Sequence, residues 1–297
     1  MGTLQTDFFN KLSKYVSYTS LDEMNYAVYV SLKHKYVYVE TAKVACSSIK
    51  LTLQRLELED KSFKRDTFQD IHNRQFSPLL KLQQIPRFEK LMRGDDFFRF
   101  CFVRNPYTRT LSAYLDKIKG NSTREKSKVL SQLGYDTQDM SIPISFDQFV
   151  TVLEEQPILK MDNHWRHQYY STYQDTIRYN FIGKLERFSE DFSFVMKKLG
   201  AQEYYKQESR HATNSISKLR EYYTDDLLNR VYSLYKLDFE TNPANIGSPA
   251  REKKETAITA DRNGARRDRP ARLAISSLPV ALYITAMPRN TAMFVTP

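Results

Sequence analysis

The chain has 297 residues, 41% of them hydrophobic and 13% aromatic, which is enough apolar content for a globular core and excludes a disordered chain. Its charged fraction of 27%, its mean hydropathy of -0.59 and the lack of any stretch near the roughly 20 apolar residues of a spanning helix exclude a transmembrane protein. Half of the net charge of +10 lies from Ser248 onward, where there are nine Lys/Arg and four Asp/Glu. Residues 1–247 contain 36 Lys/Arg and 31 Asp/Glu, and this smaller excess of positive charge suits an anionic ligand rather than a nucleic acid.

Up to about residue 245, short apolar segments alternate with helical patterns, which predicts βαβ units and a mainly parallel sheet flanked by helices. The stretch VYVSLKHKYVYVE predicts a hairpin of two strands, the second being Tyr36–Val39. A helix follows, because Ile49, Leu53 and Leu56 recur at helical spacing. The fold class is therefore α/β.

The next elements begin with a second buried strand, FFRFCFV. Proline suits the first turn of a helix, so a helix is expected from Pro106 to about Lys117. Ser145 and Ser189 each precede a periodic apolar segment that a serine can cap, and Gly200 ends the second of these helices. Between the two helices, YNFIGK predicts another strand.

The last expected helix lies in YTDDLLNRVYSLYKLDF, where Thr224 is the predicted cap and two acids occupy the first turn. Beyond this segment the composition changes to Arg, Ala, Pro and Thr with little periodicity. We therefore expect one domain over residues 1–246 and an appended or disordered tail over residues 247–297.

The N-terminus and the cysteines bear on the cellular compartment. The first 18 residues carry acidic and polar side chains where a secretory signal has an apolar block. Cys46 and Cys101 make no disulfide framework and lack the paired spacing of a zinc site, so reduced thiols are expected. These features predict a cytoplasmic protein.

The loop after the Tyr36–Val39 strand, TAKVACSS, places small residues and hydroxyls around Lys43. A strand that turns through small residues into a helix presents backbone N–H groups and the positive end of the helix dipole to one point, which suits a phosphate. The loop is not a Walker A motif, because that motif has glycines and places its lysine next to the hydroxyl. The alternative is an ordinary turn with a solvated lysine and a serine cap.

A second polar element follows the FFRFCFV strand, with Arg104 at its carboxyl end and Ser112 on the next helix. Ligands of open α/β sheets bind at such strand ends, where an arginine can make a bidentate contact to phosphate. The alternative is that Arg104 pairs with an acid such as Asp116. Together with the Lys43 loop, this element predicts a nucleotide with phosphates at both ends.

The segments ETAKVACSSIK and FVRNPYTRTLSAYLDK resemble the 5′-phosphosulfate loop and the 3′-phosphate element of sulfotransferases that use 3′-phosphoadenosine 5′-phosphosulfate (PAPS). The resemblance continues through DNHWRHQ, YNFIGKLERFSEDF and YYTDDLLNRVYSLYKLDFE, over about residues 26–241, and is strongest to Golgi carbohydrate sulfotransferases and bacterial relatives. It implies a P-loop-like three-layer fold and makes residues 1–246 a sulfotransferase domain. Ala42 departs from the proline usual before the lysine, and the missing membrane anchor and stem lead us to expect a soluble enzyme of bacterial type.

By this resemblance, Lys43 stabilises the negative charge that develops on the leaving phosphate oxygen while the sulfuryl group moves to an acceptor hydroxyl. Arg104 and Ser112 are implied to bind the 3′-phosphate. No metal is expected, since lysine and arginine can stabilise this transfer, and the acceptor is expected to be a carbohydrate or a related metabolite. The residues implied to hold the 5′-phosphate are Val44, Ala45, Cys46, Ser47 and Ser48.

The acceptor hydroxyl benefits from a general base, and the position of a histidine decides among the candidates. In sulfotransferases the base usually follows the strand between the two phosphate elements, which makes His72 the first choice, with Asp70 as an orienting or alternative carboxylate. His164 is the second candidate, and it could instead shape the acceptor pocket with Trp165 and His167.

Two other classes of function stay open. A kinase-like phosphotransferase is disfavoured by the missing Walker and Gly-rich loops, and a nucleotide- or polyanion-binding module without catalysis fits the basic charge. The segment SRHATNS, with Arg210, His211 and Asn214, is expected either to fold over the nucleotide or to be a solvated linker. A nucleic-acid partner is not expected, and the sequence does not predict an oligomeric state.

Overall fold

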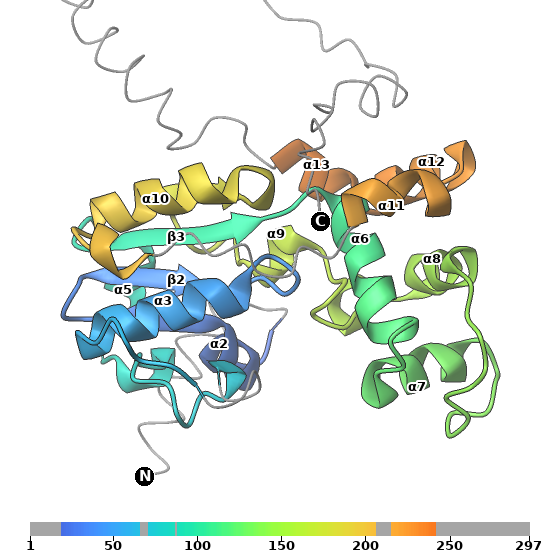
Figure 1. Ribbon diagram of the computed structural model, residues 1–297, viewed down its shortest axis with the longest axis horizontal. Coiled ribbons are helices and arrows are strands. Elements are labelled where there is room, and N and C mark those ends of the chain that lie inside the picture. The colour runs from blue at the N-terminus through green and yellow to red at the C-terminus, as the bar shows by residue number, and fades with distance from the viewer. Residues whose placement is uncertain (1–18, 66–70, 87, 206–214, 242–297) are drawn as a thin grey trace, which may run out of the picture.

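The computed structural model describes residues 19–65, 71–86, 88–205 and 215–241, and its centre is a four-stranded sheet (Figure 1). The strand order is β1-β2-β3-β4, with β1 antiparallel to β2 and the other neighbours parallel. The predicted hairpin and the mainly parallel sheet are therefore confirmed. The strands are β1 (Val28–Ser31), β2 (Tyr36–Val39), β3 (Phe98–Val103) and β4 (Phe181–Lys184).

Helices cover both faces of the sheet, because successive side chains of a strand point to opposite faces. Tyr38 and Phe100, whose ring centroids lie 5.3 Å apart, are buried with α3 and α10. Val39 and Cys101 are buried on the other face with α2 and α5. The protein thus has a mixed α/β architecture. These helices are α2 (Leu21–Ala27), α3 (Cys46–Leu58), α5 (Phe88–Arg93) and α10 (Phe188–Lys198).

A group of helices with its own core packs beside the sheet (Figure 1). Leu111, Phe149, Trp165 and Val231 are buried together in this core. Helix α6 leads from β3 into it, so the residues that follow β3 lie where the two parts meet. The helices on this side are α6 (Pro106–Ala113), α7 (Thr123–Gln132), α8 (Phe146–Glu155), α9 (Gln168–Ser171), α11 (Ser215–Tyr222), α12 (Asp225–Leu234) and α13 (Lys236–Thr241).

Three of the predicted helix ends are confirmed. Ser145 caps α8 by accepting a hydrogen bond from the amide of Gln148 (3.1 Å), and Thr224 caps α12 through the amide of Leu227 (3.3 Å). Gly200 follows α10 with a φ of 64°, which glycine adopts without steric cost. Local capping chemistry was therefore a reliable guide to these boundaries.

One other boundary was predicted wrongly. Ser189 does not cap α10, because a 3₁₀ turn over Leu185–Arg187 leads straight into the helix and leaves Ser189 inside its first turn. The helix expected from Pro106 to about Lys117 is confirmed, with a regular α-helical part that ends at Ala113 and a π-helical turn over Tyr114–Ile118. Three further 3₁₀ turns are Leu82–Gln84, Ile158–Lys160 and Gln202–Tyr204.

Among the residues that the structure describes, no helix has the length and apolar character needed to cross a membrane. The predicted tail over residues 247–297, and the domain boundary at residue 246, lie outside the described residues.

Candidate functional site

The loop between β2 and α3 has an unusual backbone. Lys43 and Ala45 adopt positive φ angles of 68° and 50°, a left-handed conformation that costs a non-glycine residue roughly 1–2 kcal/mol. Ala45 is the N-cap of α3, and no described side chain caps this end. The first N–H groups of a helix have no partner within the helix, so this end is suited to an anion.

The Lys43 side chain is only 14% exposed, and its ammonium lies 3.0 Å from the Asp116 carboxylate. Lys117 pairs with the same carboxylate at 3.3 Å. Burial lowers the pKa of Lys43, although the nearby Asp116 works in the opposite direction. The lysine is therefore not a solvated surface residue, and Asp116, the acid named as a possible partner of Arg104, binds Lys43 instead.

A group of buried polar and charged side chains fixes the two ends of the loop. Lys50, which is fully buried, donates to Glu40 Oε2 (2.8 Å), and Tyr29 donates to the same oxygen (3.0 Å). Burial alone raises the pKa of the Glu40 carboxyl, but the Lys50 ammonium outweighs it and holds the pKa at about 2. Burial, together with the Glu40 charge, raises the pKa of the neighbouring Cys46 thiol to about 11, so Cys46 is a small protonated side chain.

His72 joins this charge group. Its Nε2 lies 3.0 Å from Ser47 Oγ, and its Nδ1 lies 2.6 Å from Lys50 Nζ. The distance from Nδ1 to Glu40 Oε1 is 3.7 Å, which is too long for a hydrogen bond. The structure thus places His72 against the start of α3, next to the loop hydroxyl of Ser47. Asp70, the carboxylate proposed beside it, lies outside the described residues.

Arg104 reaches the Lys43 loop from the end of β3. Its Nη1 donates to the backbone oxygen of Lys43 (3.1 Å), and its Nε donates to Thr108 Oγ1 (3.0 Å). Burial lowers the pKa of Arg104 to about 10, and Glu186 partly offsets this effect. The two predicted phosphate elements are therefore in direct contact. Ser112 lies further along α6 and is 1% exposed.

Arg109 is a residue that the sequence analysis missed. Its guanidinium is buried and donates to three backbone oxygens, those of Ala42 (3.1 Å), Arg166 (2.8 Å) and Asn163 (2.9 Å). One side chain thus ties the residue before Lys43 to the segment that carries His164. A sequence signal existed, because Arg109 is a charged residue inside the otherwise buried α6.

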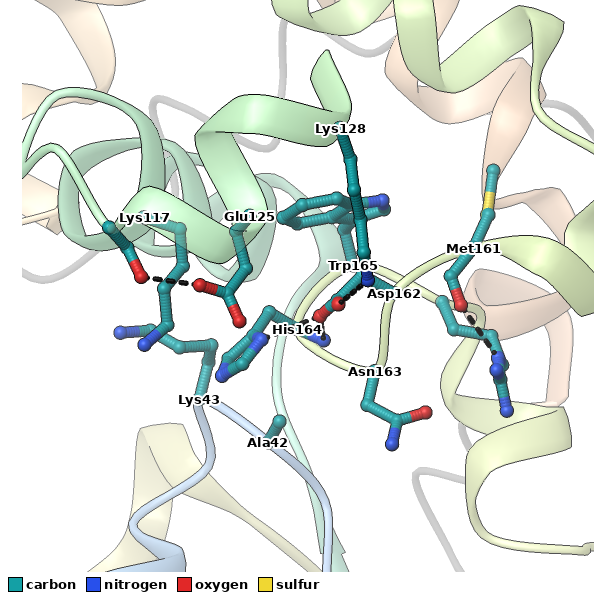
Figure 2. A network of polar contacts seen from close by, with 12 residues as sticks. Ala42, Lys43, Lys117, Glu125, Lys128, Met161, Asp162, Asn163, His164 and Trp165 are labelled. Atoms are coloured by element: carbon teal, nitrogen blue, oxygen red, sulfur yellow. Dashed lines mark hydrogen bonds and ion pairs between the residues drawn. The ribbon is translucent and has the colours of Figure 1, made fainter. Parts of the chain in front are cut away.

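His164 lies on the Asn163–Trp165 side of this clamp (Figure 2). Its Nδ1 is 2.6 Å from Asp162 Oδ1, and the Asp162 carboxylate also accepts from the backbone N of His164 (3.1 Å) and from Lys128 Nζ (3.0 Å). Burial raises the pKa of Asp162, but the His164 and Lys128 contacts lower it well below the ordinary range. Asp162 was also missed, although an acid two residues before a histidine was readable from the sequence.

The other two aromatic residues of this segment, Trp165 and His167, are buried and do not line the pocket beside the Lys43 loop. Trp165 is 1% exposed and donates through Nε1 to Gln156 Oε1 (3.0 Å). His167 is 4% exposed, packs against the ring of Tyr235, and neither of its ring nitrogens has a hydrogen-bond partner among the described residues. Burial lowers the pKa of His167, which keeps it neutral. Both side chains are thus buried, and their contribution to an acceptor pocket stays a prediction.

A small pocket opens beside the loop, between α2 and the segment after α8. Arg166 crosses its wall and donates to Glu23 Oε1 (3.0 Å). The loop and the clamped segment thus share a cavity, to which the loop contributes Ala42. The lining residues are Glu23, Tyr26, Ala27, Glu40, Ala42, Asn163, Arg166, Ser171 and Tyr173.

Within the part of the chain that the structure describes, two groups of side chains bring possible metal-ligating atoms within 4.8 Å of one another. In the first, Lys50 already lies 2.8 Å from Glu40 and 2.6 Å from His72, so a cation would compete with an ammonium. In the second, Lys128 occupies the Asp162 carboxylate. The members of the two groups are Glu40, Cys46 and His72, and Glu125, Asp162 and His164.

Comparison with known families adds to this geometry. The model described as "Sulfotransferase family" matches residues 26–241, a range that contains the Lys43 loop, Arg104, Ser112 and both candidate bases. The chain belongs to the sulfotransferase family. No solved structure gives a significant match to this family member.

Curated relatives place this sulfotransferase chain near the carbohydrate branch, as the sequence resemblance indicated. Carbohydrate sulfotransferase 14 of Danio rerio is 29% identical over 188 residues, covering 60% of this chain and 49% of the relative. The Homo sapiens protein of the same name is 26% identical over 194 residues, covering 62% and 50%. Carbohydrate sulfotransferase 11 of Rattus norvegicus is 24% identical over 230 residues, covering 69% and 63%. The chain thus spans about half the length of the first two relatives.

The segment with Arg210, His211 and Asn214, expected to cover the nucleotide or to form a linker, lies outside the described residues. The structure therefore brings together Lys43 and Ser47 of one segment, His72, Arg104 and the clamped His164 segment, from four separate parts of the chain.

Proposed function

We propose that the protein transfers the sulfuryl group of PAPS to a hydroxyl of a carbohydrate acceptor, and that its α/β architecture is of the P-loop-like three-layer type. The observation that carries this proposal is the hydrogen bond from Arg104 Nη1 to the backbone oxygen of Lys43. It joins a cationic strand end to a lysine loop with an uncapped helix start, within a chain of the sulfotransferase family. Two anion-binding elements in contact suit a nucleotide with phosphates at its 3′ and 5′ ends.

The 5′-phosphosulfate is assigned to the start of α3. Its amides between Val44 and Ser48 point along the helix dipole, and the left-handed Ala45 allows the backbone to approach a phosphate closely. Cys46 contributes a small protonated side chain there. The 3′-phosphate is assigned to Arg104 and Ser112, whose recognition separates PAPS from nucleotides without a 3′-phosphate.

In the transfer, the acceptor oxygen forms a bond to sulfur while the bond from sulfur to the 5′-phosphate oxygen breaks. Negative charge grows on the leaving oxygen, and a cation fixed beside that oxygen lowers the barrier. Lys43 is assigned this role, which requires that its ammonium exchange Asp116 for the phosphosulfate. The proton of the acceptor hydroxyl goes to a general base, for which His72 and His164 are the candidates.

The carbohydrate acceptor is supported by relatives named carbohydrate sulfotransferases. Lysine and arginine supply the positive charge in this scheme, so no metal is assigned a role. We take the competing possibilities, a kinase-like phosphotransferase and a binding module without catalysis, as outcomes of the test.

The test incubates the full chain with [³⁵S]PAPS and, separately, dextran, hyaluronan or chondroitin. We expect ³⁵S to enter at least one polysaccharide with release of an equal amount of adenosine 3′,5′-bisphosphate, and Lys43→Ala to lower both by about 10²–10³-fold. Transfer from [γ-³²P]ATP in place of PAPS would establish the kinase instead. Bisphosphate binding without any sulfuryl transfer would leave only the binding module.

A further inference from the structure

The two candidate bases differ in which ring nitrogen can accept a proton. A neutral imidazole has one N–H donor and one lone pair, and a lysine ammonium can only donate. Because Lys50 Nζ lies 2.6 Å from His72 Nδ1, the lone pair of His72 is on Nδ1 and is used by the lysine. The proton is then on Nε2, which donates to Ser47 Oγ at 3.0 Å. His72 retains no lone pair for a substrate proton.

His164 has the opposite arrangement. A carboxylate can only accept, so the contact of 2.6 Å between Nδ1 and Asp162 Oδ1 places the proton on Nδ1. The lone pair is then on Nε2, the nitrogen that faces away from Asp162. The His164 side chain is 26% exposed and the His72 side chain is 23% exposed, so the two histidines differ in their hydrogen-bond partners rather than in their exposure. A carboxylate that fixes the tautomer of a histidine is a recurrent way to orient a base.

The His164 segment is also held against the reactive loop. Arg109 binds the backbone oxygens of Ala42 and Asn163, the residues that precede Lys43 and His164. In Figure 2 the His164 ring lies between the Ala42–Lys43 loop and the Glu125 carboxylate. Arg109 thus holds the segment that carries His164 and the loop that carries Lys43 next to each other.

We propose that His164, oriented by Asp162, is the general base of the reaction, and that His72 is a positioning residue that holds Ser47 in the phosphate loop. This inference rests on the proposed function. The acceptor O–H proton passes to His164 Nε2, the acceptor oxygen bonds to sulfur, and adenosine 3′,5′-bisphosphate leaves with the electrons of the broken S–O bond. The imidazolium formed is stabilised by the Asp162 carboxylate.

Several charged groups surround His164 and enter its pH dependence. Asp162 precedes it on the same segment, and Glu125 of α7 has a carboxylate oxygen within 4.8 Å of its ring nitrogen. Lys128 of α7 binds Asp162, and Figure 2 shows the Lys43 and Lys117 side chains to the left of the His164 ring.

The test compares His164→Gln with His72→Gln as its matched control, using [³⁵S]PAPS and the polysaccharide that the wild-type chain sulfates fastest. For His164→Gln we expect kcat to fall by about 10²–10⁴-fold, the usual contribution of a general base, with the Kd for adenosine 3′,5′-bisphosphate changed less than about twofold. The acidic limb of the pH profile of kcat/KM should disappear. For His72→Gln we expect the opposite pattern: the KM for PAPS should rise, and the acidic limb of the pH profile of kcat/KM should be retained.

Asp162→Asn provides a second variant, because it leaves His164 in place and removes the group that fixes its tautomer. We expect kcat to fall and bisphosphate affinity to stay at the wild-type value. Near wild-type kcat in His164→Gln, or loss of the acidic limb in His72→Gln instead, would overturn the assignment while the proposed function stands. Absence of transfer by the wild-type chain would refute the proposed function itself, and this inference with it.

Discussion

The connection from β3 to α6, here called the α6 crossing, caps the start of its helix with its own side chain. The connection from β2 to α3, the α3 crossing, has no such cap among the described residues. In the first, Asn105 accepts from the amide of Tyr107 (2.9 Å), and Pro106 occupies the first turn. In the second, the N-cap is Ala45 in a left-handed conformation, without a side-chain cap among the described residues. A turn whose side chain accepts hydrogen bonds from the first amides of the helix stabilises the fold. A strained turn whose first amides have no such acceptor can bind a ligand through them.

The two crossings also differ in the buried contacts that fix their position. The α3 crossing is anchored by the buried Glu40–Lys50 ion pair, and the α6 crossing by hydrogen bonds between Arg104 and the amide side chain of Gln168, each of 2.8 Å. A loop with strained backbone and a lysine at its tip needs a rigid base, because such strain persists only where the surroundings enforce it. The five predictions below test this contrast.

Glu40→Gln should have the largest effect. The substitution leaves the fully buried Lys50 ammonium without a counter-charge, which typically costs about 3–5 kcal/mol in the free energy of unfolding. Urea unfolding at pH 7 measures the loss. Glu59→Gln, at an exposed pair with Lys33, is the control and should change stability by less than about 0.5 kcal/mol.

The same residue predicts an acid dependence. Its pKa is about 2 in the folded protein, below the ordinary value of 4.5, so its contribution to stability is complete above pH 4.5 and is lost as the pH falls toward 2. The wild-type chain should therefore lose more stability than Glu40→Gln over this pH range. Equal losses would show that the Glu40 charge is not an anchor.

Lys43→Ala should lower kcat/KM for sulfuryl transfer by about 10²–10³-fold, because the leaving oxygen loses its cation. The side chain is part of the ligand site rather than of the core, so the unfolding free energy should stay near the wild-type value. Lys33→Ala, which removes an exposed lysine from the β1–β2 turn, is the matched control and should keep wild-type activity. Wild-type turnover in Lys43→Ala would remove this lysine from the mechanism.

Arg104→Ala should weaken adenosine 3′,5′-bisphosphate by roughly tenfold to a hundredfold, since charge-assisted hydrogen bonds contribute about 1.5–3 kcal/mol. Affinity for 5′-AMP, which has no 3′-phosphate, should change less than the bisphosphate affinity. Titration calorimetry with both nucleotides separates the two results. An equal loss for both would mean that Arg104 supports the Lys43 loop rather than the 3′-phosphate.

Asn105→Ala should have the smallest effect, about 1 kcal/mol in the free energy of unfolding, which is the usual value of a helix cap. Thr224→Ala removes a comparable cap from α12, remote in sequence from both crossings, and should cost a similar amount. Thermal unfolding of the two variants side by side gives the comparison. A much smaller loss in Asn105→Ala would mean that the α6 crossing is not closed by its own side chain.

The sequence predicted the parts of this site that are encoded locally. Side-chain pattern and turn chemistry over a few residues predict each of these parts, which are the Tyr36–Val39 strand, the loop of small residues around Lys43 and the helix start at Pro106. The role of Arg109 could not be predicted in this way, because its three acceptor carbonyls come from two loops that only the tertiary fold brings together. The tautomers of His72 and His164 depend likewise on Lys50 and Asp162, whose contacts are set by packing.

The most direct test of the account is a calorimetric titration of the full chain with adenosine 3′,5′-bisphosphate, 5′-AMP and ATP in the absence of metal. If the Lys43 loop and Arg104 form one nucleotide site, the bisphosphate should bind with a Kd on the order of micromolar, and 5′-AMP should bind at least about tenfold more weakly because it lacks the second phosphate. Equally weak binding of all three nucleotides would contradict this prediction. The Lys43 loop and Arg104 would then be in contact without forming one nucleotide-binding site.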